Sequence, residues 1–296
     1  MLPYHLLFPL GLFYTSNAII GIIGNGVMIM CYFKNPEISE NSLSSCHLFI
    51  TLTCLSDLFH LAGELIYSTE IFGKLTTTQY ICYYMMIIPI MGASAGSPLI
   101  MAIGIDRLIA VMFPARYRNI QNGKKRYIAI QLLFSVAYTV SVVVLGYQYR
   151  VISDNFMAQC PLPVALLGFP FEFLTYISAL IYLLVIIIYS TVYFLLKTQP
   201  ASARFKSVFN SLLITVIVVI GWVATTLINI INYRLISDEL INEIVLDYSG
   251  IPVNIGVASN VFVFYVINLE YRKTINSIFG IRKSDQTTVS VTSQKQ

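Results

Sequence analysis

Charged residues are scarce in this sequence of 296 residues. Asp, Glu, Lys and Arg make up 11% of the chain, whereas hydrophobic residues make up 57%. A soluble domain carries roughly 25% charged residues. The shortage excludes an ordinary soluble protein and indicates a chain that is solvated largely by lipid.

Catalytic and nucleotide-binding motifs are also missing. There is no Walker loop, His-Glu-x-x-His zinc motif or nucleophile elbow. The glycine-rich run at 21–26 lies inside an apolar stretch with no preceding strand, and the basic run at 122–126 lies between two apolar stretches. These runs favour helix packing and a short loop over nucleotide or nucleic-acid binding. We therefore predict no enzymatic activity and no cofactor.

Long apolar stretches dominate what is present. Each of seven stretches is long enough, at roughly 1.5 Å per residue, to cross a hydrocarbon core about 30 Å thick. Lipid offers no partners for open backbone groups, so spans of this length must be helices. The expected fold is an all-α seven-transmembrane bundle, and the first stretch is too long for the core of a signal peptide. The stretches are Phe8–Phe33, Cys46–Tyr67, Tyr80–Phe113, Tyr127–Tyr147, Leu166–Leu196, Val208–Ile231 and Ile244–Leu269.

Basic residues are distributed unevenly over the connections. All of the 18 Lys and Arg residues except Lys74, Arg150 and Arg234 lie on one side of the predicted membrane. Short loops rich in Lys and Arg are retained in the cytoplasm. The amino terminus is therefore expected outside the cell and the carboxy terminus inside.

The five cysteines divide between compartments under this orientation. Cys31, Cys46 and Cys54 fall inside the membrane or near its cytoplasmic face, and only Cys82 and Cys160 face the oxidising exterior. A Cys82–Cys160 disulfide is the economical interpretation, and two free thiols are the alternative.

Several polar residues interrupt the apolar spans. Asp106 and Arg107 lie 25 residues after Cys82 (107 − 82), roughly 37 Å along one helix, which places the charged pair at the cytoplasmic end. Isolated polar side chains deep in other spans usually face the bundle interior and bond one another or water, so a buried cluster is expected. The members of this polar core are Asn25, Asp57 and Asn260.

The positions of these residues resemble the motifs of rhodopsin-like G-protein-coupled receptors. Asp106-Arg107-Leu108 resembles the family's Asp-Arg-Tyr, and the short ends together with Tyr271-Arg272 are most similar to nematode serpentine chemoreceptors of class Sx. The family's prolines of spans 5, 6 and 7 and its span 4 tryptophan are not found. Further matching positions are Asn25, Asp57, Cys82, Pro114, Tyr117, Trp222 and Asn260.

The resemblance implies a role for each matching residue. Trp222 and Phe264 correspond to activation switches, and the cluster around Asp57 to a site for a sodium ion or for waters alone. Arg204 and Lys206 stand at the base of span 6, where an acid would lock Arg107, so the Asp106 pair is the expected restraint. The residues implied in coupling to a heterotrimeric G protein are Asp106, Arg107, Phe113, Pro114 and Tyr117.

The predicted ligand pocket lies at the outer ends of the spans. Pro89 occupies the position at which receptors resembling those for biogenic amines carry an aspartate, and Asn254 occupies that of an opsin-like lysine, which excludes a retinal Schiff base. We expect a small, mainly neutral organic ligand; the alternatives are an amine whose counter-ion has moved to Glu64, a neuropeptide, or a transporter. The lining expected is Glu64, Met86, Pro89, Ile90, Glu172, Trp222, Asn254 and also Asp247.

The ends of the chain complete the expected organisation. Residues 1–283 form the receptor domain, with Tyr271, Ile275, Ile278 and Phe279 in a short amphipathic helix on the inner leaflet. Residues 284–296 are polar and expected to be disordered. Such a tail suits phosphorylation and arrestin binding, and equally a plain solvated end. The plasma membrane is the expected location, with sensory cilia as a candidate site.

Overall fold

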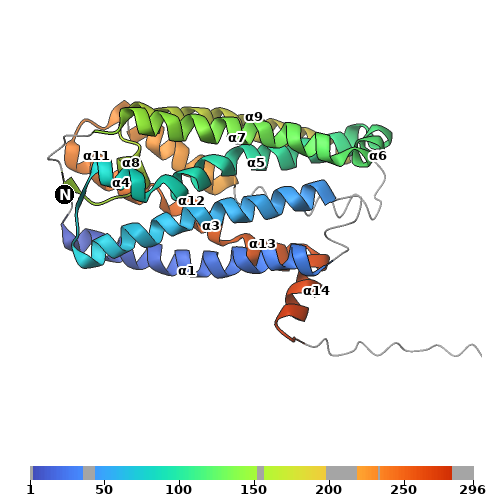
Figure 1. The fold of residues 1–296 in the computed structure, drawn as a ribbon, viewed down its shortest axis with the longest axis horizontal. Helices are drawn as coiled ribbons and strands as arrows, with labels where there is room; N and C mark the ends of the chain where they lie inside the picture. Colours follow the sequence, from blue (N-terminus) through green and yellow to red (C-terminus); the bar gives the residue numbers. More distant parts are fainter. Residues whose placement is uncertain (1–2, 36–43, 152–156, 198–218, 233, 282–296) are drawn as a thin grey trace, which may run out of the picture.

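The computed structural model describes residues 3–35, 44–151, 157–197, 219–232 and 234–281. These residues form an elongated bundle of roughly parallel helices (Figure 1). Six helical runs in the described part are long and apolar enough to cross a membrane. They are α1 (Tyr4–Lys34), α3 (Ser44–Gly73), α5 (Ile87–Met112), α7 (Lys124–Tyr149), α9 (Phe169–Lys197) and the run Leu240–Ile267.

The predicted sixth span is described only from residue 219 onwards, as the apolar helical run Val219–Asn232. Its earlier part, and the disordered tail predicted at 284–296, lie outside the described residues. The all-helical bundle with its long apolar helices confirms the expected fold class. The run Leu240–Ile267 includes α11 (Glu239–Tyr248) in part, α12 (Ile251–Ala258) and α13 (Asn260–Ile267).

Short elements close the two ends of the bundle. At one end, α4 (Gln79–Met85) and α8 (Leu162–Ala165) lie beside the two-residue strands β1 (Thr77–Thr78) and β2 (Met157–Ala158), which pair antiparallel. This end also holds the Cys82–Cys160 disulfide and is called the disulfide end. The opposite end carries Arg107, α6 (Pro114–Asn122) and α14 (Leu269–Ile278), and is called the Arg107 end.

The helix α5 lies at the centre of the bundle, where it contacts α3, α7 and α9. Gly92 permits the close approach of α3, because a Cβ atom there would lie 2.5 Å from both the backbone nitrogen of His60 and the carbonyl oxygen of Ser56. The Ser56 hydroxyl donates to the Gly92 carbonyl at 2.6 Å. Gly92 therefore serves close packing between two helices of the same chain.

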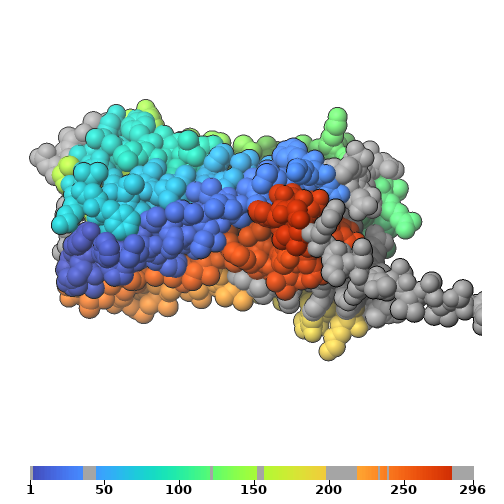
Figure 2. Space-filling view, turned by 90° about the horizontal axis from the view of Figure 1, so that it is seen from below, coloured from blue at the N-terminus to red at the C-terminus, as the bar shows by residue number. Residues whose placement is uncertain are grey.

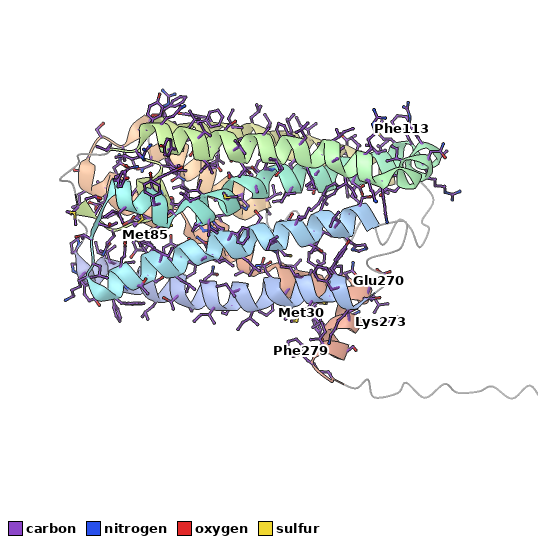
Figure 3. The ribbon with its side chains drawn as sticks, viewed as in Figure 1. Met30, Met85, Phe113, Glu270, Lys273 and Phe279 are labelled. Atoms are coloured by element: carbon purple, nitrogen blue, oxygen red, sulfur yellow. A yellow bond between two sulfur atoms is a disulfide. The ribbon has the colours of Figure 1, made fainter. Side chains whose placement is uncertain are left out.

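The outer surface of the bundle is apolar along the long helices. Ile23 on α1, Leu133 on α7 and Phe194 on α9 each expose more than 60% of their surface, and Met30 points away from the bundle (Figure 3). Soluble proteins rarely expose apolar patches of such extent. This surface therefore suits hydrocarbon rather than water.

The third span is divided, where a single helix over Tyr80–Phe113 was expected. The division falls at Met86, between α4 and α5, although the Met86 N–H still bonds to the Cys82 carbonyl. Pro89 gives the physical reason, because a proline cannot donate the N–H that would bond Met85 and its ring crowds that carbonyl. The expectation of one uninterrupted helix between Cys82 and Arg107 was wrong at this position.

The helix α14 packs beside the end of α1 at the Arg107 end (Figure 2). The Asn268 side chain caps it by accepting from the N–H groups of Glu270 and Tyr271. Of the four residues expected to face the inner leaflet, Tyr271 and Ile275 are instead buried against the bundle, Ile278 is half-buried and only Phe279 is exposed. The apolar stripe of α14 therefore packs partly against the bundle, and its end at Phe279 faces outward.

Candidate functional site

A cavity of about 100 Å³ lies inside the bundle near the disulfide end. Its walls come from α1, α3, α5, α8, α9, the Val219–Asn232 run and the segment from α11 to α12. Aromatic and proline side chains supply most of the apolar lining, including Tyr14, Tyr67, Phe171 and Trp222. A mostly apolar cavity with a few fixed polar groups is typical of a small-molecule site.

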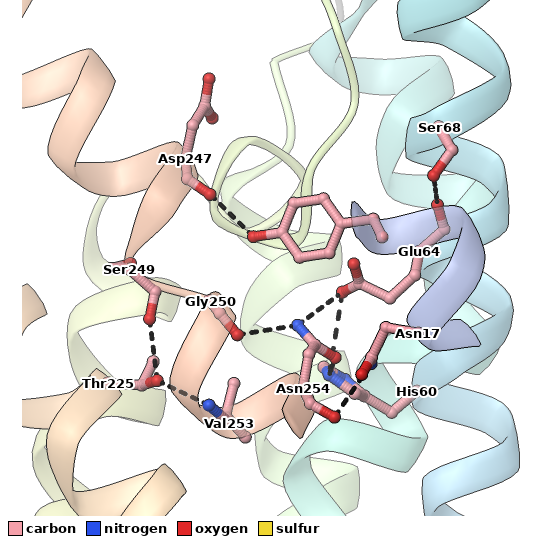
Figure 4. A network of polar contacts seen from close by, with 11 residues as sticks. Asn17, His60, Glu64, Ser68, Thr225, Asp247, Ser249, Gly250, Val253 and Asn254 are labelled. Carbon is pink, nitrogen blue, oxygen red and sulfur yellow. Dashed lines mark hydrogen bonds and ion pairs between the residues drawn. The ribbon is translucent and has the colours of Figure 1, made fainter. Parts of the chain in front are cut away.

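The polar wall of the cavity is built around Asn254 (Figure 4). Its Nδ2 donates to Oε1 of Glu64 at 3.1 Å and to the Gly250 carbonyl at 2.9 Å. Its Oδ1 lies 3.2 Å from Nε2 of His60, and its backbone carbonyl accepts from Asn17. Asn254 therefore joins α1, α3 and α12 at one point.

Two hydroxyl groups hold together the break between α11 and α12. Thr225 donates to the Ser249 carbonyl at 2.8 Å, and the Val253 N–H donates back to the Thr225 oxygen at 3.1 Å. Tyr14 donates to the Asp247 carbonyl at 2.7 Å. The carbonyl and N–H that the interrupted helix leaves open are thus satisfied by neighbouring helices.

Trp222 forms part of the cavity wall, stacks on Tyr182 and packs at an angle against the ring of His60. Its ring centroid lies 5.8 Å from that of Tyr182, with the planes 26° apart, and 5.9 Å from that of His60. Trp222 thereby links α9 to α3 across the cavity, and a ligand there would touch all three elements.

The segment that follows Cys160 lines one side of the cavity through Pro161, Leu162 and Pro163. It is fixed at several points. The Cys82–Cys160 disulfide joins the loop to α4, and the Cys160 N–H donates to Oε2 of Glu70 at 2.5 Å. Gln79 donates to the Ala165 carbonyl at 3.0 Å and accepts from the Val151 N–H at 2.8 Å. The expected disulfide is confirmed, and Cys31, Cys46 and Cys54 are free and buried.

The polar core lies deeper in the bundle, between α1, α3 and α13. Nδ2 of Asn260 donates to Oδ2 of Asp57 at 2.7 Å and to Oδ1 of Asn25 at 2.9 Å, and Asn25 donates to the Val257 carbonyl at 3.1 Å. The three side chains expected to cluster are therefore in contact. Among the described residues no group of three or more His, Cys, Asp or Glu side chains could hold a metal ion.

Arg107 and Asp106 are buried at the opposite end of α5. Nε of Arg107 donates to Sγ of Cys46 at 3.1 Å, and its guanidinium lies 3.7 Å from the Asp106 carboxylate. The Tyr117 hydroxyl donates to both oxygens of that carboxylate, at 3.2 and 3.1 Å. Burial raises the pKa of Tyr117 above its ordinary value, so the phenol remains a donor.

A second cluster at the Arg107 end involves the start of α14. The Phe264 ring lies 4.8 Å from the ring of Tyr271, whose hydroxyl is 3.1 Å from Nδ1 of His47. Burial raises the pKa of Tyr271 well above its ordinary value, which keeps this hydroxyl protonated. The cluster ties α13 and α14 to the beginning of α3.

Comparison with known proteins assigns the chain to a family. A family model described as serpentine type 7TM GPCR chemoreceptor Srsx matches residues 18–279. The chain belongs to the Srsx family. The match covers the polar core, the Arg107 cluster and all of the cavity lining except Tyr14. A comparison with curated proteins finds none that matches this chain.

Membership in the Srsx family confirms the resemblance drawn from the motifs and the expectation that the chain is not an enzyme. The Srsx receptor is a multi-pass membrane protein of the chemoreceptor class. Its ligand and its G-protein coupling are matters for proposal.

Most residues expected at the ligand pocket line the cavity of this Srsx receptor. Two do not. Ile90 is fully buried in the apolar core and does not line the cavity. Glu172 lines a neighbouring cavity of about 200 Å³ beside the Val219–Asn232 run. The residues that line the first cavity as expected are Glu64, Met86, Pro89, Trp222, Asn254 and Asp247.

Sequence reasoning missed other functional residues of the Srsx receptor. Tyr14 and Tyr67 line the cavity, and Cys46 and His47 contact Arg107 and Tyr271 respectively. Their side chains are common in apolar spans and carry no motif. The polar residues Thr225 and Asn229, one turn apart in the sixth span, offered a signal that could have been read as a cavity face.

The predicted coupling surface is partly exposed. Phe113 is 50% exposed beside the start of α6, where Pro114 occupies the first turn. Tyr117 is buried under α6 and faces Asp106 rather than the surface. Phe113 and Pro114 are therefore available to a partner in this state, whereas Asp106, Arg107 and Tyr117 are not.

Proposed function

We propose that the protein is a chemosensory G-protein-coupled receptor, which converts binding of an external small organic ligand into activation of a Gα subunit. One observation carries the proposal. The helix α5 contributes Pro89 to the cavity and Arg107 to the opposite end of the bundle, 18 residues away (107 − 89), or roughly 27 Å. One element therefore connects a ligand-sized space with a buried, charged coupling motif.

The mechanism we propose is a shift between two arrangements of the bundle. A ligand that binds the active arrangement more tightly than the resting one raises its population by that difference in affinity. Trp222 and Phe264 are the proposed switches, since Trp222 lines the cavity and Phe264 packs on Tyr271 near the polar core. The asparagines around Asp57 hold the middle of the bundle, with water or sodium, in the resting arrangement.

The step at the Arg107 end is the release of Arg107. In the resting arrangement its donors face Cys46 and Asp106. In the active arrangement Arg107 would contact the carboxy-terminal helix of Gα, and the exposed Phe113 and Pro114 would add contacts. Arrestin would compete for the same surface once the tail is phosphorylated.

The orientation belongs to this proposal. The disulfide end faces the exterior and the Arg107 end the cytoplasm, in agreement with the distribution of Lys and Arg. The receptor then lies in the plasma membrane, sensory cilia included, with the cavity near the external face.

The size of the cavity favours a small ligand over a neuropeptide. One water molecule needs roughly 10–15 Å³ of cavity volume on this measure, so a cavity of about 100 Å³ has room for a small organic molecule but not for a peptide segment of several residues. A folded peptide segment would require the loop held by Cys160 and Glu70 to leave.

The decisive experiment measures nucleotide exchange. The purified protein in lipid nanodiscs should accelerate exchange on at least one class of Gα, and Arg107→Ala should abolish the acceleration. Arg234→Ala is the matched control, because Arg234 is an exposed arginine far from Arg107. Solute flux into vesicles without exchange on any Gα class would replace the receptor with the transporter alternative.

A further inference from the structure

The charged residues that line the first cavity are of one sign. Glu64 and Asp247 contribute carboxyl groups, and none of the described residues that line it is Lys or Arg. Glu64 lies on α3 and Asp247 on α11, and in Figure 4 only the backbone carbonyl of Asp247 is hydrogen-bonded, to Tyr14, whereas its carboxylate points away from the Asn254 network. A ligand that enters the cavity therefore meets two acids and no permanent cation.

One oxygen of Glu64 has no partner. Its Oε1 accepts from Asn254 at 3.1 Å, whereas Oε2 is buried and makes no hydrogen bond to any described residue. In Figure 4 this second oxygen points away from Asn254. A buried carboxyl oxygen is costly to leave unpaired, and carboxyl groups at membrane depth mark ligand or ion sites.

His60 does not satisfy Glu64. Because Nδ2 of Asn254 donates to Glu64 and Gly250, its Oδ1 must accept, and Nε2 of His60 is the donor that faces it at 3.2 Å. The same Nε2 lies 3.9 Å from Oε1 of Glu64, beyond hydrogen-bond distance. Asn254 thus fixes the orientation of Glu64 and leaves Oε2 for another donor.

The remaining lining suits a cation attached to an apolar group. Tyr14, Tyr67 and Trp222 surround the acids with aromatic rings, whose faces attract ammonium groups. The neighbouring cavity of about 200 Å³ shares Phe171 and Leu246 with the first. An apolar tail can therefore extend from the acids into the second space.

We propose that the ligand is a small primary ammonium ion. Its NH₃⁺ group donates to Oε2 of Glu64, the Asp247 carboxylate adds a second negative charge, and its hydrocarbon tail lies along Trp222 toward the second cavity. This assignment rests on the proposed function only in taking the cavity as the ligand site. It replaces the mainly neutral ligand expected from Pro89, because the counter-ion stands on α3 instead of α5.

The test is a direct binding measurement that requires no G protein. Purified protein in nanodiscs is titrated with isobutylammonium and 2-phenylethylammonium chloride and, separately, with isobutanol and 2-phenylethanol, and Tm is recorded. The ammonium ions should raise Tm in a saturable way, and the alcohols of the same shape should not. Glu64→Gln should weaken the apparent affinity by at least about tenfold, since one partner of a buried charge pair is lost.

A matched variant controls for general effects of charge. Glu270→Gln removes a carboxylate that is exposed on α14 at the Arg107 end, and it should leave the ammonium response unchanged. Asp247→Asn should weaken binding less than Glu64→Gln, because Oε2 of Glu64 is the proposed direct acceptor and Asp247 adds only a second charge on the lining.

Three results would overturn the assignment. These are an equal response to the alcohols, an ammonium response that survives Glu64→Gln, and no response to either ammonium ion. None of them bears on nucleotide exchange, so failure of the ammonium assignment is distinct from failure of the proposed coupling. Conversely, saturable ammonium binding without exchange on any Gα class would retain the site and remove the coupling.

Discussion

Nε of Arg107 donates to Sγ of Cys46 across the gap between α5 and α3, at 3.1 Å. The neighbouring Asp106 carboxylate accepts hydrogen bonds from the Tyr117 hydroxyl and lies 3.7 Å from the Arg107 guanidinium. The resting position of Arg107 thus depends on a thiol of the second span as well as on its neighbour in sequence. A thiol is a weak acceptor, and such a contact holds an arginine without preventing its release.

Cys46→Ala should raise basal nucleotide exchange. Loss of a weak bond to a charged donor destabilises the resting arrangement by about 1 kcal/mol, which corresponds to roughly a fivefold change in the equilibrium. The measurement is agonist-free exchange at matched surface level. Cys31→Ala is the control, because Cys31 is another buried free cysteine without this contact; equal basal activity in the two variants would contradict a role for Cys46.

Tyr117→Phe and Asp106→Asn should both raise basal exchange. The first removes the donor to both Asp106 oxygens, and the second removes the charge that faces Arg107. Because both changes act on one network, the rise in basal exchange of the double variant should be smaller than the sum of the two single rises. Tyr265→Phe serves as the control for an exposed tyrosine, and strict additivity of the two effects would argue against a shared network.

Asn260→Ala should lower the thermal stability of the protein. It leaves the buried oxygens of Asp57 and Asn25 without their shared donor, at a cost of about 1–3 kcal/mol for each unsatisfied group. Tm in detergent or nanodiscs measures the loss. Ser16→Ala removes only the two bonds of an exposed hydroxyl to backbone carbonyls of its own helix and should leave Tm almost unchanged. An Asn260→Ala protein as stable as the unmodified one would refute the structural role.

Cys82→Ser and Cys160→Ser should fail alike in surface expression and signalling, because each removes the same disulfide. Glu70→Gln should weaken the same loop less severely, since the amide oxygen still accepts from the Cys160 N–H. Glu70→Ala should come closer to the cysteine variants. Normal signalling by either single serine variant, or free thiols at both positions in mass mapping, would exclude the predicted role of the bond.

The features predicted correctly from sequence involve residues whose chemistry allows few partners in their surroundings. Asn25, Asp57 and Asn260 stand out because polar side chains in apolar spans must find one another, and the structure joins them. Cys82 and Cys160 could be paired because orientation leaves the other cysteines in a different compartment. In each case one strong physical constraint decides the answer.

The features that sequence did not reveal depend on rotation of helices about their axes. Ile90 and Met86 are four residues apart, on one side of the helix, yet only Met86 lines the cavity, whereas Ile90 is enclosed by the core. Tyr14 and Cys46 are ordinary residues of apolar spans, and their roles follow from the helix that happens to lie opposite. Patterns along one chain do not specify such pairings.

The contact at Gly92 limits which parts of the bundle can move. At Gly92 the backbones of α3 and α5 lie too close to admit a Cβ atom, and Ser56 bonds to the Gly92 carbonyl, so this contact resists sliding of one helix along the other. Glu64 on α3 and Arg107 on α5 are therefore expected to move together as parts of one rigid helix pair. Opening at the Arg107 end would then require the other helices to move relative to the α3–α5 pair. Even the methyl group of alanine at position 92 would push α3 and α5 apart.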